Sequence, residues 1–144
     1  MKLACNTRVD GPAEVAFPSG LIGFEEVKHF QLAELPGQVH FCRLTALCGT
    51  LSLLLVNPFA AFPDYELVLS AADTEELALN GPEEALVLVT VTIPAGNVRL
   101  ATANLAAPLL FNTRLRLGRQ VIAADGLYRL KEPLFAAAGR ARCG

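Results

Sequence analysis

The chain has 144 residues, of which 53% are hydrophobic and 18% are charged, with a net charge of −2. A chain of this length buries about two thirds of the surface that it exposes when unfolded, and its apolar content excludes intrinsic disorder. Asn104, Pro108 and Asn112 interrupt the longest apolar stretch, so no segment supplies the roughly 20 residues of a bilayer span. The N-terminus lacks the apolar core of a signal peptide, and we expect a cytoplasmic protein that does not bind membranes.

Charge is unevenly distributed along the chain. Residues 1–98 carry 4 Lys/Arg against 12 Asp/Glu, whereas residues 99–144 carry 8 against 2. One interpretation is that the two portions lie against each other and neutralise; the other is an acidic face that attracts a basic partner. The basic residues are few and are not interleaved with aromatic residues, which argues against direct nucleic-acid binding.

Short segments with strand patterns, separated by turn residues, occupy the first half of the chain. Strands are predicted at residues 2–7, 14–17, 28–34, 39–44, 51–56 and 66–69. The 51–56 segment is almost wholly apolar, which is typical of a strand covered on both sides.

Two loops in this half carry candidate functional residues. Ser19–Glu25 has two glycines around an apolar pair, which predicts a tight loop with positive φ. We expect its side chains Leu21, Ile22 and Phe24 to be tucked under the sheet. The Asn57–Glu66 loop bears three aromatic residues at three-residue spacing, namely Phe59, Phe62 and Tyr65. These aromatic residues are either a plug for the open end of a barrel or a solvent-facing docking surface.

The second half begins with the one predicted helix. In Ser70–Leu79, Ser70 or Asp73 can cap the helix, and acidic residues fill its first turn. The strongest predicted strand, 85–93, alternates between two apolar faces. Turn residues at 94–97 predict a hairpin between this strand and 98–104, and Asp-Gly at 125–126 predicts a last hairpin between 119–123 and 127–130.

The apolar stretch around Pro108 predicts a strand, a corner and a second strand. Proline has no N–H and cannot occupy the middle of a paired central strand. Asn104 and Asn112 flank the apolar run, and a buried amide without a partner costs about 1–3 kcal/mol. Together the elements predict an all-β, mainly antiparallel fold, a compact β-barrel-like domain with one short helix. The domain covers residues 1–133, residues 134–144 form a flexible C-terminal tail, and a monomer is expected.

The catalytic inventory is thin. His29 and His40 lie on predicted strands without an obvious nucleophile, and Asp64 and Glu66 form the only carboxylate pair near an aromatic loop. The cysteines follow no zinc-site or disulfide spacing; they are Cys5, Cys42, Cys48 and Cys143. We therefore expect no catalytic residues, no metal and no cofactor, and a binding protein rather than an enzyme. A small-molecule- or cofactor-binding β-barrel protein or enzyme remains the alternative.

Five motifs in a fixed order carry a family resemblance. They are FPSGLIGFE at 17–25, VNPF at 56–59, FPDYE at 62–66, TANLAAP at 102–108 and GRQVI at 118–122. Together they resemble the flagellar assembly factor FliW from about residue 2 to about residue 133. The resemblance implies a β-barrel-like, non-enzymatic protein that binds flagellin and the translational repressor CsrA in the cytoplasm. Flagellin would displace CsrA from the factor, so that flagellin level controls flagellin translation.

The resemblance also suggests partner-binding residues. Charged contacts are expected from Glu25, Asp64 and Glu66, and the grooves for flagellin helices from the aromatic loop and the apolar corner 105–111. Three amides match motif positions and either hold the corner by backbone hydrogen bonds or touch a partner; they are Asn104, Asn112 and Gln120. The chain departs from the family at Thr45-Ala46, where a Gln-Ser pair is usual, and in the shortened acidic turn that follows.

Overall fold

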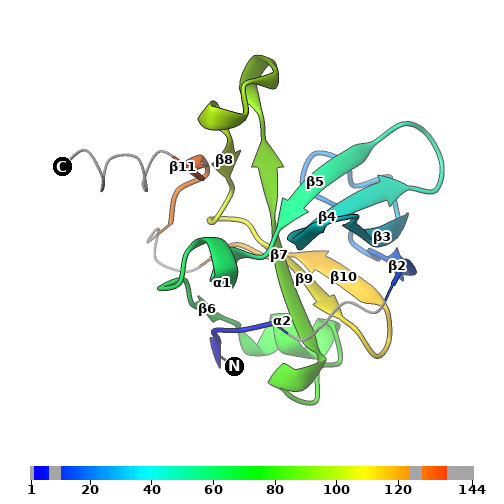
Figure 1. The fold of residues 1–144 in the computed structure, drawn as a ribbon. Helices are drawn as coiled ribbons and strands as arrows, with labels where there is room; N and C mark the ends of the chain where they lie inside the picture. The colour runs from blue at the N-terminus through cyan, green and yellow to red at the C-terminus, as the bar shows by residue number, and fades with distance from the viewer. Residues whose placement is uncertain (1, 7–10, 124–127, 136–144) are drawn as a thin grey trace.

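The computed structural model describes residues 2–6, 11–123 and 128–135. Its β-strands form a closed seven-stranded barrel, with β7 crossing the centre of the view in Figure 1. Around the barrel the strands are β7 (Ala85–Thr92), β5 (Ser52–Val56), β4 (Gln38–Ala46), β3 (His29–Leu35), β2 (Ala13–Ala16), β10 (Leu117–Gln120) and β9 (Leu109–Asn112). The barrel closes because β9 also pairs with β7. Every neighbouring pair is antiparallel except β2 and β10, which are parallel.

Smaller elements cover the outside of the barrel. Next to β7 lies β8 (Thr102–Ala103), which is followed by the edge strand β11 (Glu132–Pro133). A separate two-stranded sheet pairs β1 (Lys2–Leu3) with β6 (Leu67–Val68). The helical segments are α1 (Pro58–Ala61), α2 (Ala71–Glu76), η1 (Pro82–Glu84), η2 (Pro94–Gly96) and η3 (Val98–Leu100). The fold consists mostly of strands, and its helices are short. This confirms the predicted all-β, barrel-like class.

Strand β7 separates two apolar clusters because its side chains alternate between its two faces. Leu86 and Leu88 point into the barrel, where side chains from β2, β3, β4, β5 and β9 fill the interior. Val87 and Val89 point outward into a second cluster, which β1, β6 and the residues after α2 cover. The predicted two-faced apolar strand is therefore confirmed, and it joins the barrel to its outer layer.

Phe17 occupies the barrel interior opposite a glycine. Its ring makes edge contacts with Phe30 and Phe111, at centroid distances of 5.2 and 5.6 Å. A Cβ atom placed on Gly118 of β10 would lie 2.5 Å from the Phe17 ring. The absence of a side chain at Gly118 thus leaves the room that this ring fills.

Several predictions about local structure need correction. The 98–104 strand is only two residues long, because η2 and η3 take up the connection from β7. No strand forms at 128–130; the last described strand is β11, which pairs with β8 instead. Helix α2 was predicted, whereas α1 was not. Ile22 and Phe24 are exposed rather than tucked under the sheet, and only Leu21 is buried.

Some predictions fall partly outside the described residues. They include the end of the 2–7 strand, the Asp125-Gly126 turn and residues 136–144 of the expected tail. Within the described residues, no helix has the length and apolarity needed to cross a membrane. Leu134 and Phe135, which were assigned to the tail, are described and lie beside the barrel.

Candidate docking surface

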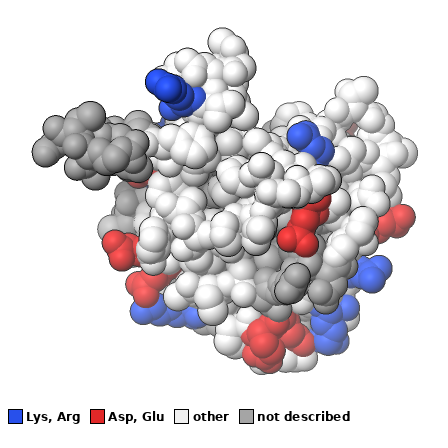
Figure 2. Space-filling view, in the orientation of Figure 1, with Lys and Arg blue, Asp and Glu red and all other residues white. Residues whose placement is uncertain are grey.

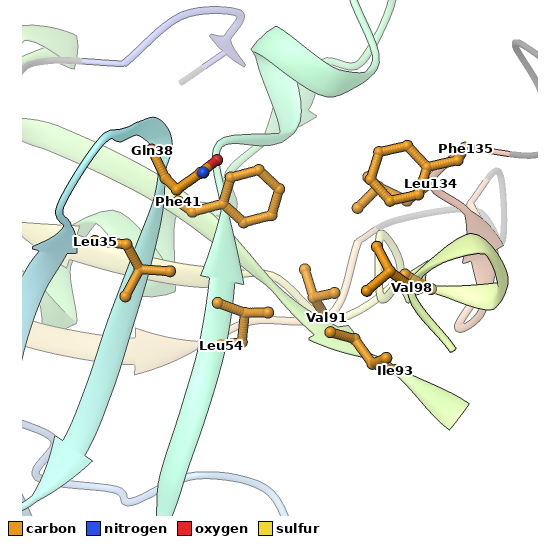
Figure 3. Close-up of a pocket in the computed structure, with 10 residues that line it drawn as sticks. Leu35, Gln38, Phe41, Leu54, Val91, Ile93, Val98, Leu134 and Phe135 are labelled. Carbon is orange, nitrogen blue, oxygen red and sulfur yellow. The ribbon is translucent and has the colours of Figure 1, made fainter. Parts of the chain in front are cut away.

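An apolar groove opens on the outside of the barrel, between β4, β5, the end of β7 and the residues after β11. Its volume is about 290 Å³. Gln38 is the only residue with a polar side chain among those that line it, which are Leu35, Gln38, Phe41, Leu54, Val91, Ile93, Val98, Ala101, Leu134 and Phe135. Figure 3 shows Leu35, Phe41 and Leu54 on one side of the groove, Val98 and Leu134 on the other, and Val91 between them.

A second hollow of about 210 Å³ extends the groove toward α1. The two share Phe41, Leu134 and Phe135, and the second is completed by His40 of β4, Val56 of β5, and Ala60 and Ala61 of α1. The groove and its extension are therefore a continuous surface that is apolar apart from the side chains of Gln38 and His40. Such a surface, open to solvent, is typical of a site that another molecule covers.

Local pairing explains how the groove residues come together. Leu54 of β5 lies opposite Val91 of β7, and Leu55 points into the barrel instead. The N–H of Leu134 donates to the carbonyl of Ala101 at 2.9 Å, which brings the end of the described chain to the groove. The Asn97 side chain accepts from the Arg99 N–H at 3.1 Å and begins η3, on which Val98 is 55% exposed.

The face shown in Figure 2, in the orientation of Figure 1, is largely uncharged in its upper part, whereas cations and carboxylates lie side by side toward its lower margin. Part of the acidic charge is neutralised by the basic half of the sequence. Arg114 pairs with Glu84 at 2.6 Å, and Arg119 pairs with Asp73 at 3.0 Å and with Glu76 at 2.8 Å. At these positions the structure supports the first interpretation of the charge distribution, mutual neutralisation.

The three predicted aromatic residues pack against the outer apolar cluster. Phe59 and Phe62 are half-buried and Tyr65 is buried. The Tyr65 hydroxyl donates to the carbonyl of Leu105 at 3.0 Å, and burial, with a smaller effect from Tyr128, raises the pKa of Tyr65 well above its ordinary value. The arrangement matches neither alternative, because the three residues lie in the outer layer rather than in the barrel opening, and Tyr65 is buried rather than solvent-facing.

The three predicted amides hold backbone segments in place. Asn104 accepts from the N–H groups of Ala106 and Ala107 at 3.2 and 3.1 Å, which forms the predicted corner. Asn112 is fully buried; it donates to the carbonyl of Leu77 at 2.7 Å and accepts from two N–H groups of the following turn. The apolar corner 105–111 is mostly buried, so it does not form the groove that was expected there.

Gln120 joins two loops that are distant in sequence. Its Oε1 accepts from the Ile22 N–H at 2.9 Å, and its Nε2 donates to the Ala107 carbonyl at 2.9 Å. The geometry thus gives all three predicted amides structural partners.

The predicted carboxylates do not form a single site. Glu25 is exposed on the loop after β2, where it accepts from the Gly23 N–H at 2.9 Å. Asp64 and Glu66 are exposed after α1, and Glu66 pairs with Lys2 at 2.9 Å. None of the nine predicted partner-binding residues lines the groove, although α1 contributes to its extension.

The sequence contained a weak signal for the groove residues that were missed. Leu54 belongs to the 51–56 strand, which has apolar residues on both of its faces. Leu134 and Phe135 are apolar although they lie after Pro133, in the expected tail. Such excess apolar residues indicate a second buried or partner-covered face. The signal could not show which strands would share that face.

Chemically reactive groups are dispersed in the described residues. No group of three or more His, Cys, Asp or Glu side chains is placed to hold a metal there. Cys5, Cys42 and Cys48 are free thiols, and Cys143 lies outside the described residues. Burial raises the pKa of the Cys42 thiol to about 11. The molecule is thus a small closed β-barrel with an open apolar groove on its outer face.

Comparison with known proteins identifies the family. The profile of the FliW protein family matches residues 2–134. The flagellar assembly factor FliW of Moorella thermoacetica is 42% identical over 120 residues, which cover 83% of this chain and 76% of the relative. That of Symbiobacterium thermophilum is 36% identical over 126 residues, which cover 86% and 91%. A crystal structure of the flagellar assembly factor FliW superposes with a TM-score of 0.79 at 33% identity, over 94% of this chain and 97% of the other. The chain therefore belongs to the FliW family.

Proposed function

We propose that this protein is a cytoplasmic flagellar assembly factor that binds flagellin and antagonises the translational repressor CsrA. The proposal has support from its membership of a family whose named relatives are flagellar assembly factors. In this role the protein works by binding and not by catalysis. Flagellin above its dissociation constant occupies the protein, CsrA is released, and translation of flagellin falls.

The apolar groove is the observation that carries the flagellin part of the proposal. Flagellin termini are amphipathic helices, and such helices dock by laying an apolar face into an apolar groove. The groove here is open to solvent, is lined almost wholly by hydrocarbon and continues toward α1. These features suit the apolar stripe of a helix better than a charged or strongly polar ligand.

The flagellin site can be tested by placing a charge at the groove. Val98→Asp is expected to weaken flagellin binding about tenfold or more, because the carboxylate would lose its hydration under the helix. Val68→Asp is the matched control: Val68 is 62% exposed on β6 and does not line the groove. Calorimetric titration with purified flagellin measures the affinity of each variant. Equal affinity of the two variants would show that flagellin binds elsewhere.

Competition between partners tests the regulatory part. Adding flagellin to the preformed complex with CsrA is expected to release CsrA as flagellin passes its dissociation constant, which size-exclusion chromatography with light scattering would show. The same experiment reports whether the free protein is a monomer. If CsrA does not bind the protein alone, the antagonist function is wrong for this chain, which departs from the family at Thr45-Ala46.

The alternative function, a small-molecule- or cofactor-binding barrel, has less support. Apolar side chains from six strands and the Phe17 ring fill the barrel interior. A small ligand would therefore have to occupy the outer groove. Native mass spectrometry of the purified protein would favour this alternative if it detected a retained ligand.

A further inference from the structure

A tight turn after β2 holds two large apolar side chains in solvent. Ile22 is 56% exposed and Phe24 is 47% exposed, whereas Leu21 beside them is buried in the barrel. Exposed apolar residues that are scattered singly over a surface are common. This turn differs because its backbone is held by several specific interactions.

The turn is organised by backbone hydrogen bonds and by a close approach of the chain to itself. The Phe24 N–H donates to the Leu21 carbonyl at 2.8 Å, and Glu25 caps the Gly23 N–H. Gly20 has a φ of +68°, and a Cβ there would lie 2.5 Å from the Cα of Glu25. A preorganised backbone lowers the entropy cost of binding, which is how rigid loops gain affinity.

A third exposed apolar side chain, Ile122, follows two residues after Gln120, which binds the turn. The Oε1 of Gln120 binds the Ile22 N–H, so the segment after β10 lies against the turn. Val121 is buried and donates to the Pro108 carbonyl, and Ile122 is 68% exposed. In this extended segment side chains alternate, so Ile122 and Gln120 point to the same side.

The charge around the turn is negative. Glu25 and Glu26 are exposed, and neither has a salt bridge within the parts of the chain that the structure describes. Lys28, whose Nζ donates to the Pro18 carbonyl at 3.2 Å, also acts electrostatically on Glu25, so that Glu25, Glu26 and Lys28 together carry one negative charge. The hydrogen bond from the Gly23 N–H lowers the pKa of the Glu25 carboxyl.

We propose that Ile22, Phe24, Glu25, Glu26 and Ile122, the turn surface, form a second protein-docking site whose occupant is a basic protein surface with an exposed aliphatic patch. The apolar side chains supply contact area, and the two carboxylates attract cations and repel nucleic-acid phosphates. None of the five residues lines the groove. The inference rests on the proposed function, in which CsrA is the basic partner, and it assigns CsrA and flagellin to different surfaces. Flagellin in the groove would then release CsrA by changing the turn surface and not by covering it.

The test measures the affinities of CsrA and flagellin for the full chain by calorimetric titration. Phe24→Ser is expected to weaken CsrA binding about tenfold or more, with flagellin affinity unchanged. Val68→Ser removes a similarly exposed apolar side chain elsewhere and is expected to leave both affinities within about twofold. Glu26→Lys is expected to weaken CsrA binding and to reduce its salt dependence more than Glu75→Lys, which changes the net charge equally.

The outcomes separate this inference from the proposed function. Unchanged CsrA affinity in both Phe24→Ser and Glu26→Lys would overturn it, as would loss of CsrA binding only in Asp64→Lys combined with Glu66→Lys. Failure of CsrA to bind the unaltered protein, with flagellin binding intact, would overturn both the CsrA function and this inference. If flagellin did not bind the unaltered protein but CsrA did, the groove assignment would be overturned, and the CsrA results would still support the turn surface.

Discussion

At the scale of single residues, the carboxylate of Glu84 connects two loops of the molecule. It accepts from the Asn80 N–H at 2.9 Å and from Arg114 Nε at 2.6 Å. The hydrogen bond from Asn80, followed by that from Arg114, lowers the pKa of the Glu84 carboxyl below its usual value of 4.5. The backbone carbonyl of Glu84 also accepts from the Thr113 N–H at 2.9 Å.

These contacts predict a pH-dependent stability. Because the pKa of Glu84 is lower in the folded than in the unfolded protein, its contribution is present above the unfolded pKa and is lost as pH falls through the folded value. Glu84→Gln is therefore expected to lower the urea midpoint at pH 7, and its midpoint is expected to approach that of the unaltered protein as pH falls through the folded pKa of Glu84. Glu83→Gln is the control and is expected to show no such convergence. A midpoint difference for Glu84→Gln that persists at low pH would contradict this explanation.

At the scale of elements, α2 ends with an alanine in a left-handed conformation. Ala78 has a φ of +51°. Its N–H donates to the Glu75 carbonyl and the next N–H, of Leu79, donates to the Thr74 carbonyl, both at 3.0 Å. This pair of bonds is the Schellman ending, in which glycine is the preferred residue. Asn112 fixes the same geometry by donating to the Ala78 carbonyl.

Ala78→Gly is expected to stabilise the protein by about 0.5 kcal/mol. Relief of the left-handed strain gains about 1–2 kcal/mol, and the greater freedom of glycine in the unfolded chain costs about 0.5–1 kcal/mol. Ala78 is exposed, so no buried methyl group is lost. Ala72→Gly, inside the same helix, is expected to destabilise instead. Urea unfolding of both variants measures these differences, and a loss of stability in Ala78→Gly would contradict the argument.

At the scale of the whole molecule, barrel closure depends on how β10 fits between β2 and β9. The Ala16 N–H donates to the Arg116 carbonyl at 3.0 Å beside the parallel pairing of Leu117 with Ala16. Inside the barrel, Gly118 leaves the space that Phe17 occupies. Strand β10 therefore contributes both to closing the barrel and, through Gly118, to packing of its interior.

Gly118→Ala is expected to destabilise the protein by about 1–3 kcal/mol, because the added methyl group overlaps the Phe17 ring. Gly118 does not have a positive φ, so the effect is steric and not conformational. Phe17→Leu should partly relieve the overlap, so the double variant is expected to be more stable than the sum of the single effects. Strict additivity in urea unfolding would show that the two residues are not coupled.

Patterns local in sequence predicted several elements correctly. The alternation in β7 indicated an apolar strand with two faces, and both faces are buried over most of its length. Ser70 or Asp73 was expected as the helix cap, and Ser70 takes this position, with its side chain accepting from the Asp73 N–H at 3.1 Å. Positive φ values at Gly20 and Gly23 agree with the tight loop that their positions predicted. The hydrogen bonds involved link residues within a few positions of one another.

Features that depend on distant residues were predicted poorly. Helix α1 has only four residues, too few to show a helical period. Ile22 was expected inside, but Gln120, 98 residues away, holds the turn so that Ile22 faces solvent. The groove combines side chains from several strands and from the residues after β11, so its existence depends on pairings across the chain.

Strand pattern, helix caps, turn glycines and the family motifs were thus readable from the order of the residues, because short-range hydrogen bonding and side-chain alternation act within a few positions. Barrel closure through β7 with β9 and β2 with β10, the exposure of the turn surface and the position of the groove required the folded chain. They arise from contacts between segments tens of residues apart, and the register of those contacts decides which apolar side chains become core and which stay open to a partner.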